Sequence, residues 1–115
     1  SGAIVNISSM GASVGVPFAP VAAAAKAALE SFTRSWAAAF GANGIRVNTV
    51  APGPTRTDGA VGTFGDGLEQ LGSATPLGRT ADPTEIAEAI VFLASPQASY
   101  LTGTTVAVDG GYTAI

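Results

Sequence analysis

Short runs of β-branched residues alternate with longer amphipathic stretches, and this alternation limits the fold of the chain more than any other feature. The pattern predicts strands over residues 3–7, 45–50 and 104–108. It predicts helices over residues 20–42 and from 83 to about 95. An order of strand, helix, strand, loop, helix, strand is typical of parallel strands joined by helical crossovers. We therefore expect an α/β fold with about three parallel strands and two main helices.

The helix boundaries carry recognisable signals. Pro20 suits a first helical turn, and Asn43-Gly44 is typical of a helix end. The segment Asp82-Pro83-Thr84-Glu85 has the pattern of a capping box. Three- and four-residue spacing predicts one buried stripe on each helix: Val21, Ala25, Leu29, Phe32, Trp36 and Phe40 on the first, and Ile86, Ala89, Ile90 and Leu93 on the second.

The segment 55–82 is rich in glycine, threonine and proline, which predicts a flexible loop with one short helix near residues 67–71. The first strand, Ala3–Ile7, is a continuous apolar run and is expected to be buried. The 115 residues fit one domain. The chain begins at Ser1 directly on a strand, so we expect a piece of a longer protein, a processed chain or a shortened one.

Composition excludes several classes of function. The net charge is −3 without any basic cluster, which argues against nucleic-acid binding. The chain has no cysteine and no histidine, which removes disulfides, thiolate and imidazole metal sites and serine–histidine triads. We predict no metal site. An absence of cysteine fits a reducing, cytoplasmic location.

The first 25 residues contain no charged side chain, yet a membrane segment is not predicted there. Glycine, serine, asparagine and proline interrupt the run throughout. No basic region precedes it, as a secretory signal would require. The sequence therefore predicts no membrane association.

Candidate site residues lie where two predicted strands end. In open α/β sheets, ligands bind beyond the carboxyl ends of the strands. Residues 6–9 and 51–54 lie at two such ends. Lys26 lies a turn or two into the following helix and could approach the same edge.

These segments resemble the short-chain dehydrogenase/reductase family. The run Ile4-Val5-Asn6-Ile7-Ser8-Ser9 with Gly11 is similar to the family's fifth-strand motif, in which Ser9 matches the catalytic serine. The family's Tyr-x-x-x-Lys motif begins thirteen positions later. Lys26 matches its lysine and is followed by Ala27-Ala28-Leu29, but the tyrosine position is occupied by Ala22.

The resemblance continues to the end of the chain. Its further matches are Ile45–Asn48, Ala51–Pro54 with Thr57, Pro76–Arg79, Pro83–Ser95, Leu101–Gly103 and Val108–Gly111. The order and spacing of these motifs imply the carboxyl-terminal half of the family's fold, a half Rossmann-like unit. The glycine-rich turn that seats the cofactor pyrophosphate in the family is not in this chain.

The resemblance also implies roles for the candidate residues. Ser9 would hydrogen-bond the substrate carbonyl, and Lys26 would lower the pKa of the family's tyrosine and hold the nicotinamide ribose. Pro52, Gly53, Thr55 and Thr57 would contact the nicotinamide end of NAD(P). The segment 55–82 would be the substrate lid, although disorder is the favoured alternative for 59–72. Tyr100 and Tyr112 are the only tyrosines, and the resemblance gives both a structural place near the last strand.

Each site residue also has a plain structural alternative. Ser9 could cap a loop, Lys26 could be a solvated lysine on an alanine-rich helix, and Pro52-Gly53 is a strand-end turn on any interpretation. In the family, the helix that matches 20–42 forms a major dimer interface. The run Ala22–Ala25 would suit such packing, so we expect a homo-oligomer through this helix and the exposed sheet edge, or pairing with a chain that supplies the first half.

Three hypotheses of function remain open. The chain could be part of an NAD(P)-dependent alcohol dehydrogenase or carbonyl reductase, impaired or inactive alone because it lacks the tyrosine and the dinucleotide half. It could be an oligomeric pseudoenzyme or interaction module that retains only the fold. It could also be a shortened form of an active enzyme in which alanine was introduced at position 22.

Overall fold

The computed structural model describes residues 1–115 and contains one parallel sheet with the strand order β1-β2-β3. The strands are β1 (Gly2–Ile7), β2 (Ile45–Pro52) and β3 (Thr105–Val108). In the register, Ile7 pairs with Val50 and Thr49 pairs with Thr105, so all three strands end at the same edge. The α/β class with three parallel strands is confirmed.

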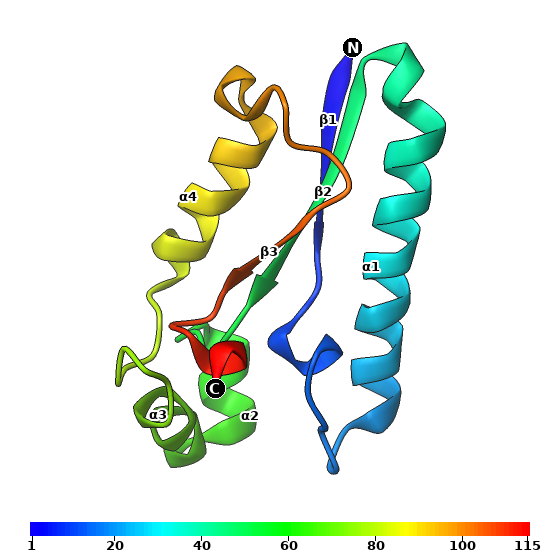
Figure 1. Ribbon diagram of the computed structural model, residues 1–115. Helices are drawn as coiled ribbons and strands as arrows, with labels where there is room; N and C mark the ends of the chain where they lie inside the picture. The colour runs from blue at the N-terminus through cyan, green and yellow to red at the C-terminus, as the bar shows by residue number, and fades with distance from the viewer.

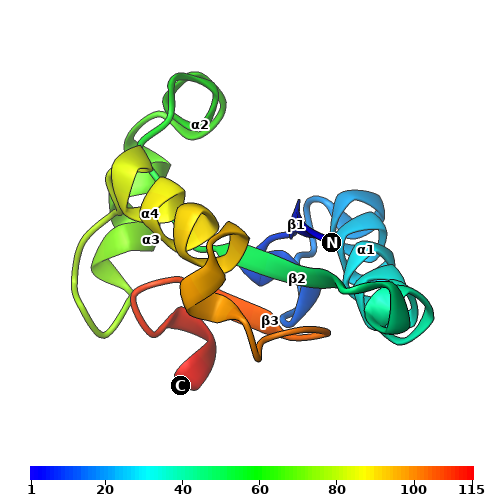
Figure 2. The same ribbon diagram turned by 90° about the horizontal axis from the view of Figure 1, so that it is seen from above.

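Two long helices cover opposite faces of the sheet. They are α1 (Pro20–Phe40) and α4 (Pro83–Ala94), and Figures 1 and 2 show them on either side of β2. Two shorter helices, α2 (Asp58–Phe64) and α3 (Asp66–Ser73), lie beyond the carboxyl end of β2 (Figure 1). Short 3-10 turns follow β1, α1, α4 and β3, at Met10–Ala12, Gly41–Asn43, Pro96–Ala98 and Tyr112–Ala114.

The main apolar core lies between α4 and the sheet. Val50 of β2, Ile86 and Leu93 of α4, and Ala98 form this buried cluster, and the predicted stripe on α4 is therefore confirmed. The predicted capping box is also present: the Asp82 carboxylate accepts a hydrogen bond from the Thr84 backbone, and Glu85 accepts one from the Asp82 backbone. This cap satisfies backbone donors at the start of α4 that otherwise lack a partner.

The predicted buried stripe of α1 is wrong. Val21 is 81% exposed and Phe32 54% exposed. Ala25 is also exposed, and Leu29, Trp36 and Phe40 are only half-buried. The positions that α1 buries are Glu30, Thr33 and Ala37.

The reason is that α1 meets a polar face of the sheet. The Thr33 hydroxyl lies 2.7 Å from the Thr49 hydroxyl and accepts a hydrogen bond from the Asn6 side chain at 2.9 Å. Small and hydrogen-bonding residues therefore face inward, because buried polar groups need partners. On the helix's outer side, Phe32 and Trp36 stack with ring centroids 5.4 Å apart.

The expectation that β1 is buried is also wrong. Its first three residues are exposed, and Ile4 and Ile7 remain 39% and 37% exposed. As an edge strand, β1 pairs only with β2, whereas β2 has a neighbour on both sides and buries Val47–Ala51 almost completely. The free edge of β1 is a surface on which further strand pairing is possible.

The segment 55–82 contains two helices instead of the single short helix predicted. The Thr57 hydroxyl accepts a hydrogen bond from the Ala60 backbone and so caps α2, and Gly65 separates α2 from α3 with a positive φ of 53°. At Gly72, an added Cβ would lie 2.5 Å from the Thr80 backbone nitrogen. Gly65 thus separates two helices, and Gly72 allows the close approach of Thr80. From composition alone, such glycines look the same as those of a flexible loop. The lid function of this segment stays a prediction.

None of the helices combines the length and the apolar character needed to cross a membrane.

Candidate functional site

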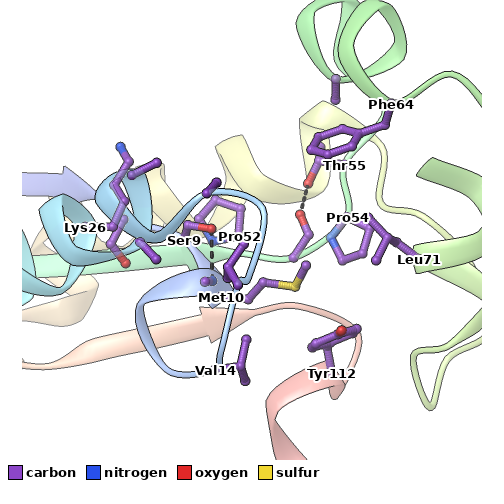
Figure 3. A pocket seen from close by; sticks show the side chains of 18 of the residues that line it. Ser9, Met10, Val14, Lys26, Pro52, Pro54, Thr55, Phe64, Leu71 and Tyr112 are labelled. Carbon is purple, nitrogen blue, oxygen red and sulfur yellow. Dashed lines mark hydrogen bonds between the residues drawn. The ribbon is translucent and has the colours of Figure 1, made fainter. Parts of the chain in front are cut away.

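A cavity of about 420 Å³ lies beyond the carboxyl ends of β1 and β2. Its walls come from the turn after β1, the first turns of α1, the Pro52–Thr55 segment, and helices α2 and α3 (Figure 3). Every residue that the sequence singled out for the site lines this one cavity: Ser9, Ala22, Lys26, Pro52, Gly53, Thr55 and Thr57. The structure therefore brings together positions that are up to 48 residues apart, from 9 to 57.

Ser9 both caps a turn and lines the cavity. Its Oγ accepts a hydrogen bond from the Gly11 backbone at 3.1 Å, at the start of the 3-10 turn Met10–Ala12. A serine hydroxyl has one proton to donate besides its acceptor lone pairs. The cap leaves that proton available for a ligand oxygen in the cavity, so the structural role and the proposed catalytic role are compatible.

Lys26 is anchored at the end of β1. Its Nζ donates a hydrogen bond to the carbonyl oxygen of Ile7 at 3.0 Å. The ammonium group has three N–H donors, so two remain for a ligand. No carboxylate lines the cavity, and Lys26 is the only charged side chain in its wall. The site is therefore electropositive at this point.

Ala22 lies one helical turn before Lys26 and also lines the cavity. Residues four apart on a helix lie on the same face. A methyl group at this position can neither donate nor accept a proton. The cavity thus offers a hydroxyl at Ser9 and a cation at Lys26, but no titratable acid between them.

The Pro52-Gly53 turn is held against the end of β3. The Gly53 backbone donates a hydrogen bond to the Val108 carbonyl at 3.0 Å, and a Cβ at position 53 would lie 2.6 Å from the Asp109 Cα. Only glycine permits this approach. Thr55 then closes the turn, because its hydroxyl donates to the Gly53 carbonyl at 2.9 Å (Figure 3).

One interaction behind the site was not foreseen from the sequence. The buried Ser8 donates a hydrogen bond from its Oγ to Glu30 Oε1 at 3.0 Å. Glu30 lies one turn after Lys26 on α1, so the contact holds the end of β1 against that helix. Two sequence features could have indicated this contact: the serine pair Ser8-Ser9 at the end of a strand, and Glu30 four positions after Lys26.

Tyr112 was given a structural place near the last strand, but the structure places its ring in the cavity wall (Figure 3). The turn that presents it depends on Asp109. Burial raises the pKa of Asp109, but hydrogen bonds from the Thr113 side chain and backbone and from the Gly111 backbone outweigh this effect and hold the pKa below its ordinary value. Asp109 is therefore a charged, fully hydrogen-bonded anchor for the turn.

The chain matches a known family model over residues 1–113, and the description of that model is enoyl-(acyl carrier protein) reductase. Among curated proteins, it is 49% identical over 115 residues to cis-4-hydroxycyclohexanecarboxylate dehydrogenase of Sinomonas cyclohexanicum, covering 100% of this chain and 46% of the relative. It is 48% identical to A-factor type gamma-butyrolactone 1'-reductase (1S-forming) of Streptomyces virginiae, covering 97% of this chain and 45% of the relative.

Solved structures agree with these sequence matches. A short chain dehydrogenase/reductase family protein is 55% identical and superposes with a TM-score of 0.93 over 99% of this chain and 46% of that chain. ElxO with NADP bound is 32% identical, with a TM-score of 0.89 over 99% of this chain and 47% of that chain. The chain thus spans about half the length of the relatives it matches.

Proposed function

Because this chain belongs to the short-chain dehydrogenase/reductase family, we propose that it forms the substrate half of an NAD(P)-dependent oxidoreductase acting on an alcohol or its carbonyl. The observation that supports this proposal is the meeting of Ser9, Lys26 and the Pro52-Gly53 turn in one cavity. The two relatives described above point the same way, because one is named a dehydrogenase of a hydroxycyclohexanecarboxylate and the other a reductase of a butyrolactone.

The residues of the cavity fit the nicotinamide end of such a cofactor. Lys26 has two free N–H donors for ribose hydroxyls, and the turn Pro52–Thr55 places Pro52, Gly53 and Pro54 in the wall, where a ring could pack. When bound, the nicotinamide would supply or accept the hydride. The diphosphate finds no comparable place, since Lys26 is the only cation in the cavity wall. NAD(P) binding therefore requires the family's first half, either on a longer chain or on a second polypeptide.

The chemistry assigned to this chain is the handling of the substrate oxygen. Ser9 donates a hydrogen bond to that oxygen, and the Lys26 ammonium favours negative charge on groups beside it. The reaction also needs a proton transfer at the oxygen, and Ala22 cannot perform it. General acid–base catalysis is worth roughly 10²–10⁴-fold, so we propose that the form with alanine at position 22 is impaired by about this factor.

A second candidate function is that of an oligomeric scaffold without turnover. The outer side of α1 favours it, because the exposed Phe32 stacks there on the half-buried Trp36 and the edge of β1 is unpaired. We propose that a homo-oligomer forms through α1 and this edge, or that a first-half chain covers the edge. Independently of the function, we propose a cytoplasmic location, because a chain without cysteine fits a reducing compartment.

Titration with NADH and NADPH, followed by nicotinamide fluorescence, tests the oxidoreductase proposal. Two proteins are compared: this chain alone, and a chimera in which it follows the first half of the Sinomonas cyclohexanicum relative. We expect micromolar binding by the chimera and millimolar or no binding by the chain alone. Lys26→Met should weaken binding to the chimera, while Arg34→Met on the exposed side of α1 should not. A folded chimera that binds neither cofactor would leave the scaffold as the function.

Light scattering of the purified chain tests the oligomer. Replacement of Phe32 and Trp36 by serine, with Val91→Ser on the exposed side of α4 as the control, should dissociate an assembly that uses α1. A monodisperse monomer for the unmodified chain would rule the homo-oligomer out.

A further inference from the structure

Tyr112 brings a hydroxyl without a protein partner to the largely apolar part of the cavity wall. Its ring is half-buried and lines the cavity, yet its hydroxyl makes no hydrogen bond within the chain. In Figure 3, Tyr112 lies near Val14 and on the opposite side of the cavity from Lys26. A phenol that lines a cavity without a protein partner is available to a ligand.

The turn that presents Tyr112 is held rigidly. Gly110 and Gly111 both have positive φ values, 64° and 89°, and the Tyr112 backbone donates a hydrogen bond to the Asp109 carbonyl at 3.1 Å. A Cβ on Gly111 would lie 2.8 Å from Cγ of Pro76, so the turn packs directly on its neighbour. These contacts fix where the backbone of Tyr112 lies beside the cavity.

The two ends of the cavity differ in polarity. The end at Ser9 and Lys26 suits the reacting oxygen. The remainder of the wall is largely apolar and contains no charged group; its members include Val14, Phe18, Phe64, Leu68 and Leu71. An ionised group placed there would lose its hydration without gaining a counter-charge. A neutral oxygen would lose less, and could regain a hydrogen bond from the Tyr112 hydroxyl.

We propose that Tyr112 determines specificity by hydrogen-bonding a neutral oxygen at the end of the substrate remote from the reacting carbonyl. This inference rests on the proposed function of the cavity. The substrate class it defines is a small, uncharged molecule with an apolar body and a second oxygen, such as a hydroxyl, across from the carbonyl. A cavity of about 420 Å³ is near the lower end of the range for ligand sites, which suits a single ring or a short chain.

The test uses two ring ketones that differ only at the remote position, 4-hydroxycyclohexanone and 4-methylcyclohexanone. Their dissociation constants for this chain are measured by NMR titration, following backbone signals of the cavity residues. The variants are Tyr112→Phe, which removes only the hydroxyl, and Tyr100→Phe as the control, because Tyr100 is fully exposed and outside the cavity.

The role of Tyr112 is tested by the ratio of the two dissociation constants, which gives the preference for the hydroxy ketone over the methyl ketone. One hydrogen bond contributes about 0.5–1.5 kcal/mol, so Tyr112→Phe should lower this preference roughly 2- to 12-fold. It should leave the affinity for 4-methylcyclohexanone unchanged, and Tyr100→Phe should retain the original preference. An unchanged preference in Tyr112→Phe would overturn the role of Tyr112 while leaving the carbonyl cavity intact. If neither ketone shifts the cavity signals in the unmodified chain, the proposed carbonyl site fails, and this inference fails with it.

Discussion

The Lys26 ammonium lies 3.0 Å from the carbonyl oxygen of Ile7, the last residue of β1. This contact joins the helix that supplies the cation to the strand end that leads into Ser8 and Ser9. Together with the hydrogen bond from Ser8 to Glu30, it sets the spacing between the hydroxyl and the cation of the cavity. The site is thus maintained by α1 and β1 without any contribution from position 22.

The Pro52-Gly53 turn gives a first prediction, since a side chain at position 53 would collide with Asp109. Gly53→Ala should destabilise the chain by about 1–3 kcal/mol, as overpacked sites do. Gly62→Ala is the matched control, because Gly62 lies near the middle of α2 with open space around it. That change should be stabilising by about 0.5–1 kcal/mol, because alanine favours a helix interior. Urea unfolding measures both, and equal effects of the two variants would contradict the close approach.

Thr33 gives a second prediction through its polar contacts between α1 and the sheet. Thr33→Val keeps the shape but leaves Asn6 and Thr49 without their shared partner. Buried groups left unpaired cost about 1–3 kcal/mol each, so the loss in unfolding free energy should exceed about 1 kcal/mol. Thr63→Val, at an exposed position of α2, should change it by less than about 0.5 kcal/mol. Wild-type stability in Thr33→Val would show that α1 does not rest on these hydrogen bonds.

The sequence predicted those parts of the fold that depend on local signals. The alternation of strands and helices, the cap at Asp82 and the helix end at Gly44 follow from patterns within a few residues, and the structure confirms them. The candidate residues identified from the spacing of Ser9 and Lys26 lie around one cavity, and their roles stay predictions.

What the sequence did not show depends on contacts between distant segments. The buried face of α1 follows from the polar side chains of Asn6 and Thr49, which lie on two strands, and hydrophobic spacing therefore pointed to the wrong stripe. The turn that carries Tyr112 to the cavity contains two left-handed glycines and packs against Pro76. Neither constraint is visible in a local window.

Glu85 gives a third prediction, which concerns pH. A side-chain hydrogen bond from Arg79, followed by one from the Asp82 backbone, lowers the pKa of Glu85 to about 2. Because the folded pKa lies below the ordinary value of about 4.3, the stabilisation is present above that value and is lost as the pH falls towards 2. The melting temperature should therefore decrease between about pH 5 and pH 2.

Variants separate the contribution of Glu85 to the pH dependence of the melting temperature from the contributions of other carboxylates. Glu85→Gln should have a lower melting temperature at neutral pH and a shallower decrease on acidification. Some decrease should remain, because the pKa of Asp109 is also lowered. Glu88→Gln, at an exposed position of α4 without an ion pair, should keep the original slope. If Glu85→Gln and Glu88→Gln give the same slope, the Arg79–Glu85 pair does not contribute.

The central claim is that alanine at position 22 limits the reaction. The most direct test of this claim is the rate of ketone reduction in the chimera with the first half of the Sinomonas cyclohexanicum relative. The rate with NADH and NADPH is compared for Ala22, Ala22→Tyr and Ala22→Phe, where phenylalanine supplies the ring without the hydroxyl. Ala22→Tyr should raise the rate about 10²–10⁴-fold, Ala22→Phe should not, and Ala22→Tyr in this chain alone should remain inactive. Equal rates for the tyrosine and phenylalanine variants would contradict the role of the missing hydroxyl at position 22. Turnover by Ala22→Tyr without the first half would contradict the need for that half.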